Sequence, residues 1–318
     1  MDPAYLVQDA IFEVHRFLDG QALGIEGETQ FLLRYWEFGE DDSGVATWSV
    51  EAYTPEYALT GRMIDSYAST TATTNPLTTK TGKADDIIKA FVRENIGSLT
   101  SLAARKNSLV TVEADLGAGP TVTKSASYDK LFDVLVDIAS DAEKQGTRVI
   151  FGMVANTDAA TLATTGYTFR TWTGQRGVNH TAGTGDEVIV SKDMENLAAP
   201  KIGYDYRQTV TAVRALGQDV GADRKTIRVE DTVRSSASPW AYRETSYDTK
   251  SETDDALTGD ANSELNKGRA VLTFSGRMID TDYARYGQRF RFGDLVTAQH
   301  YGVSFPCRVG VRGLWDRD

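Results

Sequence analysis

Cysteine and histidine, the side chains most often used in metal sites and nucleophilic catalysis, are scarce in this 318-residue chain. Cys307 is the single cysteine, which excludes an intramolecular disulfide and a thiolate metal cluster. The histidines are His15, His180 and His300, and no two of them have the spacing of metal ligands. The motifs HExxH, GxSxG and GxxxxGKS/T do not occur. We therefore expect no metal site and no cofactor, and stability must come from packing or assembly.

Long apolar runs and an excess of positive charge are also missing. No run approaches the ~18 apolar residues that a membrane-spanning helix requires. The start of the chain, MDPAYLVQDA, lacks the basic residues and apolar block of a signal peptide. The formal net charge of -11 disfavours general attraction to nucleic acid or anionic membrane, because both bind clustered positive charge. We expect a soluble protein that is made in the cytoplasm.

The composition that remains is typical of a globular protein. Hydrophobic residues make up 41% and charged residues 25% of the chain, and 14 Tyr, 12 Phe and 5 Trp supply aromatic side chains for packing. A chain of this length is expected to divide into two or three domains, because single cores stop growing at about 250–300 residues.

The first part of the chain has the pattern of strands separated by turns. Gln30 to Phe38 and Val45 to Thr54 are rich in aromatic and β-branched residues, and GEDDSG between them predicts a hairpin loop. The threonine-rich segment Ser66 to Lys83 predicts a long loop or extended arm, because Asn75-Pro76 and Thr81-Gly82 break it.

The middle of the chain predicts two helices followed by two strands. ADDIIKAFVREN, residues 84–95, places its apolar residues on one helical stripe. A second helix is capped by Ser127, carries Leu131, Leu135, Ile138 and Ala142 on one face, and stops at Gly146. The segments 147–155 and 167–173 then have the composition of strands.

After residue 200 the β character returns, interrupted by a short helix near residues 254–267. We therefore predict an α+β, mainly β fold. The predicted domains are an N-terminal β domain in residues 1–80, an inserted α/β domain in residues 81–195 and a C-terminal β domain in residues 196–318. The acidic stretch from Asp248 to Glu264 precedes a segment, Gly268 to Asp318, with eight Arg and five Asp. These opposite charges suit docking of one copy against another, or form ordinary solvated faces.

Two further features admit a functional and a structural interpretation. The glycine-rich segment Gly174 to Glu187 could bind a phosphate or sugar, or simply connect two strands. The pentapeptide GRMID occurs at Gly61 to Asp65 and at Gly276 to Asp280. Both copies are predicted on strands, so the repeat is either a trace of duplicated β domains or a coincidence.

The carboxy-terminal run RMIDTDYARYGQRFRFGDLVTAQHYGVSFPCRVGVRG resembles the closing barrel of the tail hub, or baseplate hub, proteins of long-tailed bacteriophages. Earlier segments fall in the matching order: ALTGRMIDSYA, GKADDIIKAFVREN, FRTWTGQRGVNHT, VIVSKDMENL and SPWAYRETSYDT. The resemblance is to hub proteins of the siphophage tail-tip type, and it extends from about residue 45 to the carboxy terminus.

The resemblance implies a non-enzymatic structural protein, a trimeric ring at the tail tip between the tail tube and the tip or fibre proteins. Each subunit would contribute two small β-barrel-like domains around the inserted α/β domain. DNA would pass through the ring without specific binding. Interface candidates are Tyr286, Phe290, Phe292 and Trp315, because interface centres favour aromatic residues near arginine. The alternative is that these aromatic residues fill the barrel core.

Two other functions fit the same composition. One is a tail-associated cell-wall hydrolase with paired carboxylates, since the chain has 45 acidic residues. The other is a sugar-binding receptor module, which would need exposed Trp and Tyr faces.

Overall fold

The protein is described by a computed structural model that covers residues 6–15, 17–18, 21–22, 30–40, 43–65, 77–181, 183–218, 221–249 and 253–309. Its regular structure is mostly β with a few helices, which confirms the predicted class at that level. The strands of these ranges form open sheets of two to four strands, and none of them closes into a barrel within the single chain. The two predicted barrels are therefore not found as closed units in one subunit.

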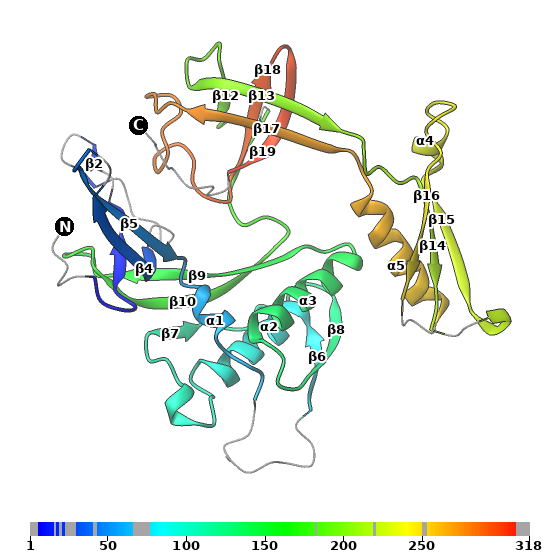
Figure 1. The fold of residues 1–318 in the computed structure, drawn as a ribbon, viewed down its shortest axis with the longest axis horizontal. Helices are drawn as coiled ribbons and strands as arrows, with labels where there is room; N and C mark the ends of the chain where they lie inside the picture. The colour runs from blue at the N-terminus through cyan, green and yellow to red at the C-terminus, as the bar shows by residue number, and fades with distance from the viewer. Residues whose placement is uncertain are drawn as a thin grey trace.

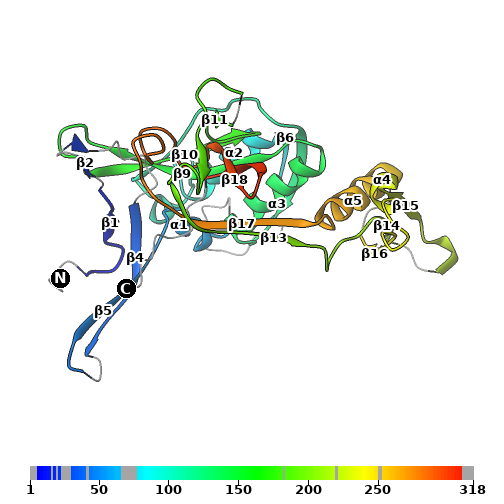
Figure 2. The same cartoon turned by 90° about the horizontal axis from the view of Figure 1, so that it is seen from above.

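The N-terminal sheet is antiparallel and has the strand order β1-β4-β5. Its strands are β1 (Ile11–Glu13), β4 (Gln30–Glu40) and β5 (Ala46–Tyr53), and β2 (Phe17–Leu18) pairs with β3 (Gln21–Ala22) nearby. The predicted hairpin is thus confirmed. In Figure 2 the β4–β5 hairpin, defined as residues 30–53, projects away from the body of the molecule.

The central body contains helices packed on strands (Figure 1). Its elements are α1 (Tyr57–Thr60), β6 (Thr78–Lys83), α2 (Ala84–Asn95), the 3-10 helix Ala103–Arg105, β7 (Val110–Val112), β8 (Thr121–Ala126), α3 (Leu131–Lys144), β9 (Val149–Thr157) and β10 (Thr164–Thr173). The sheets are β7-β10-β9 and the pair β6-β8. One apolar core joins α2, α3 and β10, and Leu59 and Ile64 from the preceding segment belong to it.

The middle helices begin and end for identifiable reasons. Residues 84–95 are helical as predicted, and the amide of Gly97 donates to the carbonyl of Val92 just beyond the helix. The predicted cap at Ser127 is wrong. The amide of Ser127 donates to Asp129 instead, and Tyr128 adopts a φ of 56°, so that the chain turns once more before α3 begins at Leu131.

The upper layer in Figure 1 combines a small sheet with a long two-stranded ribbon. The sheet holds β11 (Asn179–His180), β12 (Ile189–Ser191), β18 (Leu295–His300) and β19 (Val303–Arg308). The β13–β17 ribbon is the antiparallel pair of β13 (Leu197–Asp205) and β17 (Val271–Met278). One apolar cluster joins the two, with Leu197 buried in it and the Phe274 ring meeting Phe305 edge-on at 5.1 Å.

The ribbon leads to a distal unit with its own small core (Figure 1). The unit consists of β14 (Ala212–Leu216), the 3-10 helix Gly221–Asp223, β15 (Thr226–Glu230), α4 (Thr232–Ser235), β16 (Glu244–Asp248) and α5 (Asp254–Lys267). Leu257, Ala261 and Leu265 of α5 pack on this sheet, and the predicted helix near residues 254–267 is confirmed with the same bounds. No helix in the described part of the chain is long and apolar enough to cross a membrane.

The two GRMID copies occupy different environments. In the first, Gly61 ends α1, Met63 forms one isolated bridge with Lys130, and Ile64 is buried in the central core. In the second, Gly276 to Met278 belong to β17, and Ile279 is exposed. The prediction that both copies lie on strands is wrong for the first copy. We conclude that the repeat is a coincidence, because equal sequences in a duplicated unit would occupy equivalent places.

Candidate interaction surfaces

Two of the aromatic residues selected from the sequence lie in the core of the upper layer. Phe290 is 2% exposed among Val188, Val190 and Val296, and Tyr286 packs against the same cluster. The two rings meet edge-on at 5.7 Å. Phe290 is thus placed to stabilise its own subunit, and its role in an interface stays a prediction.

The third aromatic residue, Phe292, takes part in a stack within the chain. The guanidinium of Arg176 lies 4.7 Å from the ring centre of Phe292 and 4.2 Å from that of Trp172. Stacking on two rings stabilises the cation and ties β10 to the turn before β18. Trp315, the fourth candidate, lies outside the described residues.

The glycine-rich segment uses its backbone donors on carboxylates of the same chain. The amides of Gly183 and Gly185 both donate to the Glu187 carboxylate. The amide of Glu187 itself, followed by those of Gly185 and Gly183, lowers the pKa of the Glu187 carboxyl. The amide of Val178 donates to Asp294 at 2.6 Å. Since these donors are already occupied, the segment has the features of a structural connection rather than of a phosphate loop.

The carboxylates of the described residues do not form a metal site. No group of three or more His, Cys, Asp or Glu side chains in these ranges is arranged to hold a metal ion. His180 is buried near two carboxylates, with Asp186 Oδ2 3.2 Å from Nδ1 and Asp294 Oδ2 3.5 Å from Nε2. This trio joins the loop between β10 and β12 to the turn before β18.

The β4–β5 hairpin displays aromatic side chains to solvent. Trp36, Phe38 and Trp48 form one aromatic row, with ring centres 5.8 Å apart for Trp36–Trp48 and 4.6 Å for Phe38–Trp48. Trp36 and Phe38 are exposed. An exposed row of large apolar side chains is typical of a surface that another protein covers.

The β13–β17 ribbon continues its apolar face beyond the part that is covered. Phe274 packs on the small sheet, but Leu272 and Tyr204, which face each other across the ribbon, are exposed. Tyr204 stacks on Tyr206 at 6.3 Å, and Tyr206 is exposed as well. This face was not identified from the sequence. The alternation of apolar and polar residues in β13 and β17 does not reveal which half of the ribbon is covered by the small sheet.

The distal unit presents two highly exposed large apolar residues near its end. Between β15 and β16 the chain forms a tip loop, defined as residues 231–243, in which Val233 is 81% and Trp240 is 86% exposed. No charged residue occurs from Ser235 to Tyr242. An uncharged segment with an exposed tryptophan has the composition of an interface anchor, because Trp is enriched among residues that carry binding energy.

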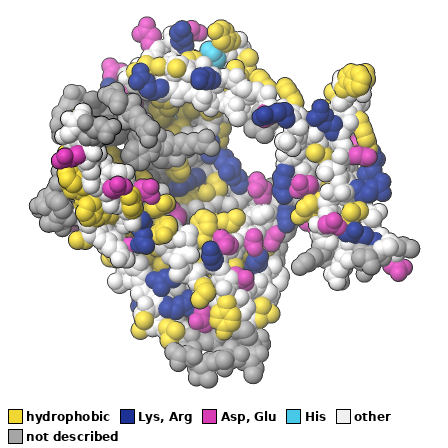
Figure 3. All heavy atoms as spheres, in the orientation of Figure 1, with side chains coloured by type: hydrophobic (Ala, Val, Ile, Leu, Met, Phe, Trp, Pro, Cys, Tyr) yellow, Lys and Arg dark blue, Asp and Glu magenta, His cyan; other side chains and the backbone are white. Residues whose placement is uncertain are grey.

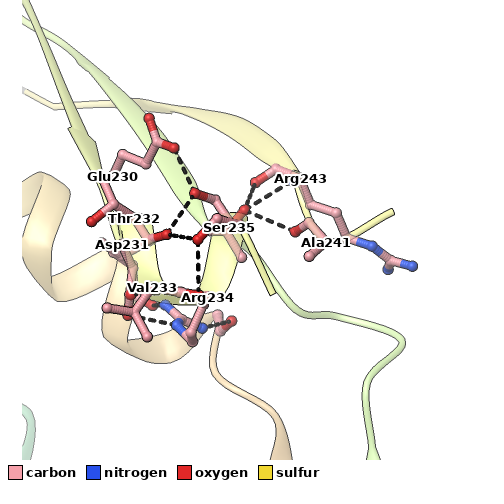
Figure 4. A network of polar contacts seen from close by, with 12 residues as sticks. Glu230, Asp231, Thr232, Val233, Arg234, Ser235, Ala241 and Arg243 are labelled. Carbon is pink, nitrogen blue, oxygen red and sulfur yellow. Dashed lines mark hydrogen bonds and ion pairs between the residues drawn. The ribbon is translucent and has the colours of Figure 1, made fainter. Parts of the chain in front are cut away.

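A network of hydrogen bonds fixes the shape of the tip loop (Figure 4). Asp231 caps α4 by accepting from the amide of Arg234, whose guanidinium donates to Asp231 and to the carbonyls of Leu265 and Gly268. Ser235 donates to Glu230 at 2.6 Å. On the other side, the Thr211 hydroxyl donates to the carbonyls of Ala241 and Arg243. The loop is therefore held in one shape before any partner binds.

We expect acid to loosen the tip loop. The Arg234 guanidinium and amide lower the pKa of Asp231, and the Ser235 hydroxyl lowers the pKa of Glu230. A carboxyl whose pKa is lowered by folding stabilises the fold above its unfolded pKa of about 4, and this contribution is lost as the pH falls through the folded value. Hydrogen exchange of the residue 231–243 amides, corrected for intrinsic rates, should be faster at pH 3 than at pH 6. Asp231→Asn should reduce this pH dependence, and equal protection at both pH values in the wild type would contradict it.

Comparison with known structures places the fold among phage tail proteins. The 43 kDa tail protein of prophage MuSo2 from Shewanella oneidensis has a TM-score of 0.51 at 14% identity, over 90% of this chain and 72% of that chain. The tail protein from Neisseria meningitidis MC58 has a TM-score of 0.50 at 15% identity, over 91% of this chain and 74% of that one. At these identities the similarity shows the fold alone. A search of curated proteins found no match.

The sequence itself supplies the family. Residues 27–315 match the profile described as Siphovirus ReqiPepy6 Gp37-like protein, and the chain belongs to this family. Family and fold together identify a phage tail protein, as the resemblance implied.

Proposed function

We propose that the chain is a structural subunit of the tail hub, forming a ring at the tail tip that joins the tail tube to the tip and lets DNA pass during infection. The observation that carries the proposal is the position of the exposed apolar residues, on the β4–β5 hairpin, on the outer half of the β13–β17 ribbon and on the tip loop. These are projecting surfaces suited to protein contacts. We propose a homotrimer, which matches the hub role. Within each subunit, we propose that residues 1–80, 81–195 and 196–318 form the three domains.

Several surfaces per subunit suit a protein with several neighbours. In the hub, copies of the chain would contact one another, the distal tail or tube protein above and the tip or fibre proteins below. The subunit would be made in the host cytoplasm and end in the virion tail. Its net charge of -11 suits a channel that repels DNA rather than one that binds it.

Cryo-electron microscopy of purified virions tests this role. The hub proposal predicts a ring of this chain at the tail tip, with an open channel whose wall is mainly acidic or neutral. Density for the chain at the head or along the tube would contradict the location, and a mainly basic channel would contradict the charge argument.

Trp240 is expected to anchor the subunit to another tail protein. Trp240→Ala should leave folding and self-association of the isolated chain unchanged, because the side chain is 86% exposed and lies at the end of the distal unit. It should weaken incorporation into tails at least tenfold, as expected for a central tryptophan in an interface. Incorporation is measured by the amount of tagged chain in purified virions after complementation. Tyr301→Ala is the comparison variant and should incorporate normally, because Tyr301 is 89% exposed and lies outside the hairpin, the ribbon and the tip loop. Full incorporation of Trp240→Ala would contradict the role.

A further inference from the structure

We propose that the free edge of β17 takes β5 from a second copy of the chain, so that the N-terminal sheet of one subunit continues the β13–β17 ribbon of its neighbour. This inference rests on the proposed hub, because it names the surfaces through which its copies meet. It follows from the free edges, from the side chains on both faces and from the charges of the two elements.

One edge of β17 is open within the described residues. In the described part of the chain β17 has one sheet neighbour, β13, although it is eight residues long. Two-stranded sheets of this kind are marginal alone, and natural proteins normally blunt a long exposed edge. The outer edge of β13 is blunted by Pro200, at the register shift between Ala198 and Lys201. β17 contains no proline, so its edge retains a full set of backbone donors and acceptors.

The matching edge belongs to β5. The sheet order β1-β4-β5 leaves β5 at the outside of its sheet within the described residues. β5 is also eight residues long, contains no proline, and belongs to the projecting β4–β5 hairpin (Figure 2). An added strand gains backbone hydrogen bonds along its whole length, which is the usual mode of strand addition.

Strands β5 and β17 each have one apolar face and one polar face. Trp48 and Val50 of β5 lie on the apolar face, beside Phe38 and Trp36, while Ser49 and Glu51 lie on the polar face. β17 alternates in the same way. Its residues Leu272 and Phe274 lie on the apolar face, and the residues Thr273, Ser275 and Arg277 lie on the polar face. Pairing the two edges therefore puts apolar side chains beside apolar ones and polar beside polar, because side chains alternate with a period of two.

The two elements carry opposite charge. Residues 30–53 contain five acidic residues and one arginine. The ribbon strands with their flanks, residues 197–207 and 269–279, contain four basic residues and one aspartate. Figure 3 shows acidic and hydrophobic side chains together over the hairpin, and Lys and Arg together with acidic and hydrophobic side chains over the upper layer. Glu51 on β5 and Arg277 on β17 are both exposed. In the parallel register that places Trp48 beside Phe274, Glu51 lies beside Arg277 across the new pair.

The contact uses two different surfaces of each subunit, so it is heterologous. A heterologous contact closes into a ring when its rotation divides a full turn, and otherwise gives an open filament. The ring of the proposed hub requires this kind of contact, whereas a twofold dimer would not.

Charge reversal tests the pairing in the full-length chain. Sedimentation velocity should show that Glu51→Arg and Arg277→Glu each weaken self-association at least tenfold, since like charges would oppose each other. The double variant should restore association. Glu143→Arg and Lys192→Glu are matched controls, because they make the same charge changes at exposed positions outside both elements.

Cysteine crosslinking gives a second measurement that does not depend on the size of the charge effect. In a Cys307→Ser background, one batch carries Glu51→Cys and another carries Arg277→Cys. Mild oxidation of the mixture should give a crosslinked dimer, whereas a mixture of Glu143→Cys with Arg277→Cys should give none, because a disulfide needs Cα atoms within about 7 Å.

The outcomes separate this inference from the hub itself. The β5–β17 pairing is supported if each single charge reversal weakens self-association, the double variant restores it, and only the Glu51→Cys and Arg277→Cys mixture crosslinks. Self-association that is unchanged by the reversals and gives no crosslink overturns the pairing while the hub stands, and a different partner then covers β17. A wild-type chain that stays monomeric at every concentration overturns both the self-assembled ring and the pairing.

Discussion

Replacing Asp85 with alanine is expected to lower the free energy of unfolding by about 3–5 kcal/mol, the cost of removing one partner from a buried ion pair. Asp85 and Lys89 are both fully buried on α2. The Lys89 Nζ atom lies 3.5 Å from the Asp85 carboxylate and 3.4 Å from Glu113, and donates to the carbonyl of Ala114 at 2.7 Å. Without Asp85 the lysine loses one of two opposite charges.

The same carboxylate also holds the segment between β7 and β8. Asp85 accepts from the amides of Leu116 at 3.1 Å and Ala118 at 2.7 Å, so its removal leaves these donors unpaired as well. The central core that depends on this arrangement also anchors Leu59 and Ile64, just after the β4–β5 hairpin. Destabilising the core should therefore also impair presentation of the hairpin.

Urea unfolding followed by circular dichroism measures this effect. Asp133→Ala is the matched control, because Asp133 is exposed in the first turn of α3 and should contribute less than about 1 kcal/mol. Asp85→Ala combined with Lys89→Met should recover part of the loss, since the uncompensated charge is then gone. A loss below about 1 kcal/mol for Asp85→Ala would show that Lys89 is satisfied by Glu113 and the backbone alone.

Replacing Gly177 with alanine is expected to cost about 3 kcal/mol, at the upper end of the cost of inserting one methyl group into a packed site. A methyl at Gly177 would lie 2.5 Å from the amide nitrogen of Asp294 and 2.6 Å from the carbonyl carbon of Gly293. These are backbone atoms, which cannot rotate away as a side chain could. The turn before β18 would have to move, and with it the Asp294 carboxylate that binds the Val178 amide.

Thermal unfolding of Gly177→Ala and Gly259→Ala provides the comparison. Nothing lies within 4 Å of a methyl at Gly259, which is inside helix α5, so this substitution should be neutral or stabilising by up to about 1 kcal/mol. Equal stability of the two variants would mean that the close backbone contact at Gly177 does not constrain the turn.

The three longer helices α2, α3 and α5 could be predicted from the sequence because their signal is local, whereas the four-residue helices α1 and α4 were missed. The apolar stripe and the acidic first turn of residues 84–95 are both within the helix, and the predicted and observed bounds agree. Strands β6 and β8 were missed for the opposite reason. TTKTGK is polar and alternates between half-buried and exposed positions, and it becomes a strand only because residues 121–126 pair with it. The sequence of residues 78–83 alone therefore indicated a loop.

The candidate surfaces were harder to predict, because exposure depends on segments distant in sequence. The segment SPWAYRETSYDT contributed to the resemblance, but the tip loop that carries Trp240 is held by contacts that Arg234 makes with Leu265 and Gly268, about 30 residues away. Phe290 was chosen for its aromatic ring beside arginine, a pattern shared by interface residues and core residues, and it lies in the core. The free edge of β17 depends on pairing with β13, some 70 residues earlier, which no local pattern encodes.

The central claim is that this phage tail protein acts by assembling with copies of itself. Native mass spectrometry of the purified full-length chain, repeated over a wide concentration range, tests that claim most directly. The proposed hub predicts a species of three times the 34.8 kDa subunit mass that dissociates on dilution. A single species at the subunit mass at every concentration would contradict it.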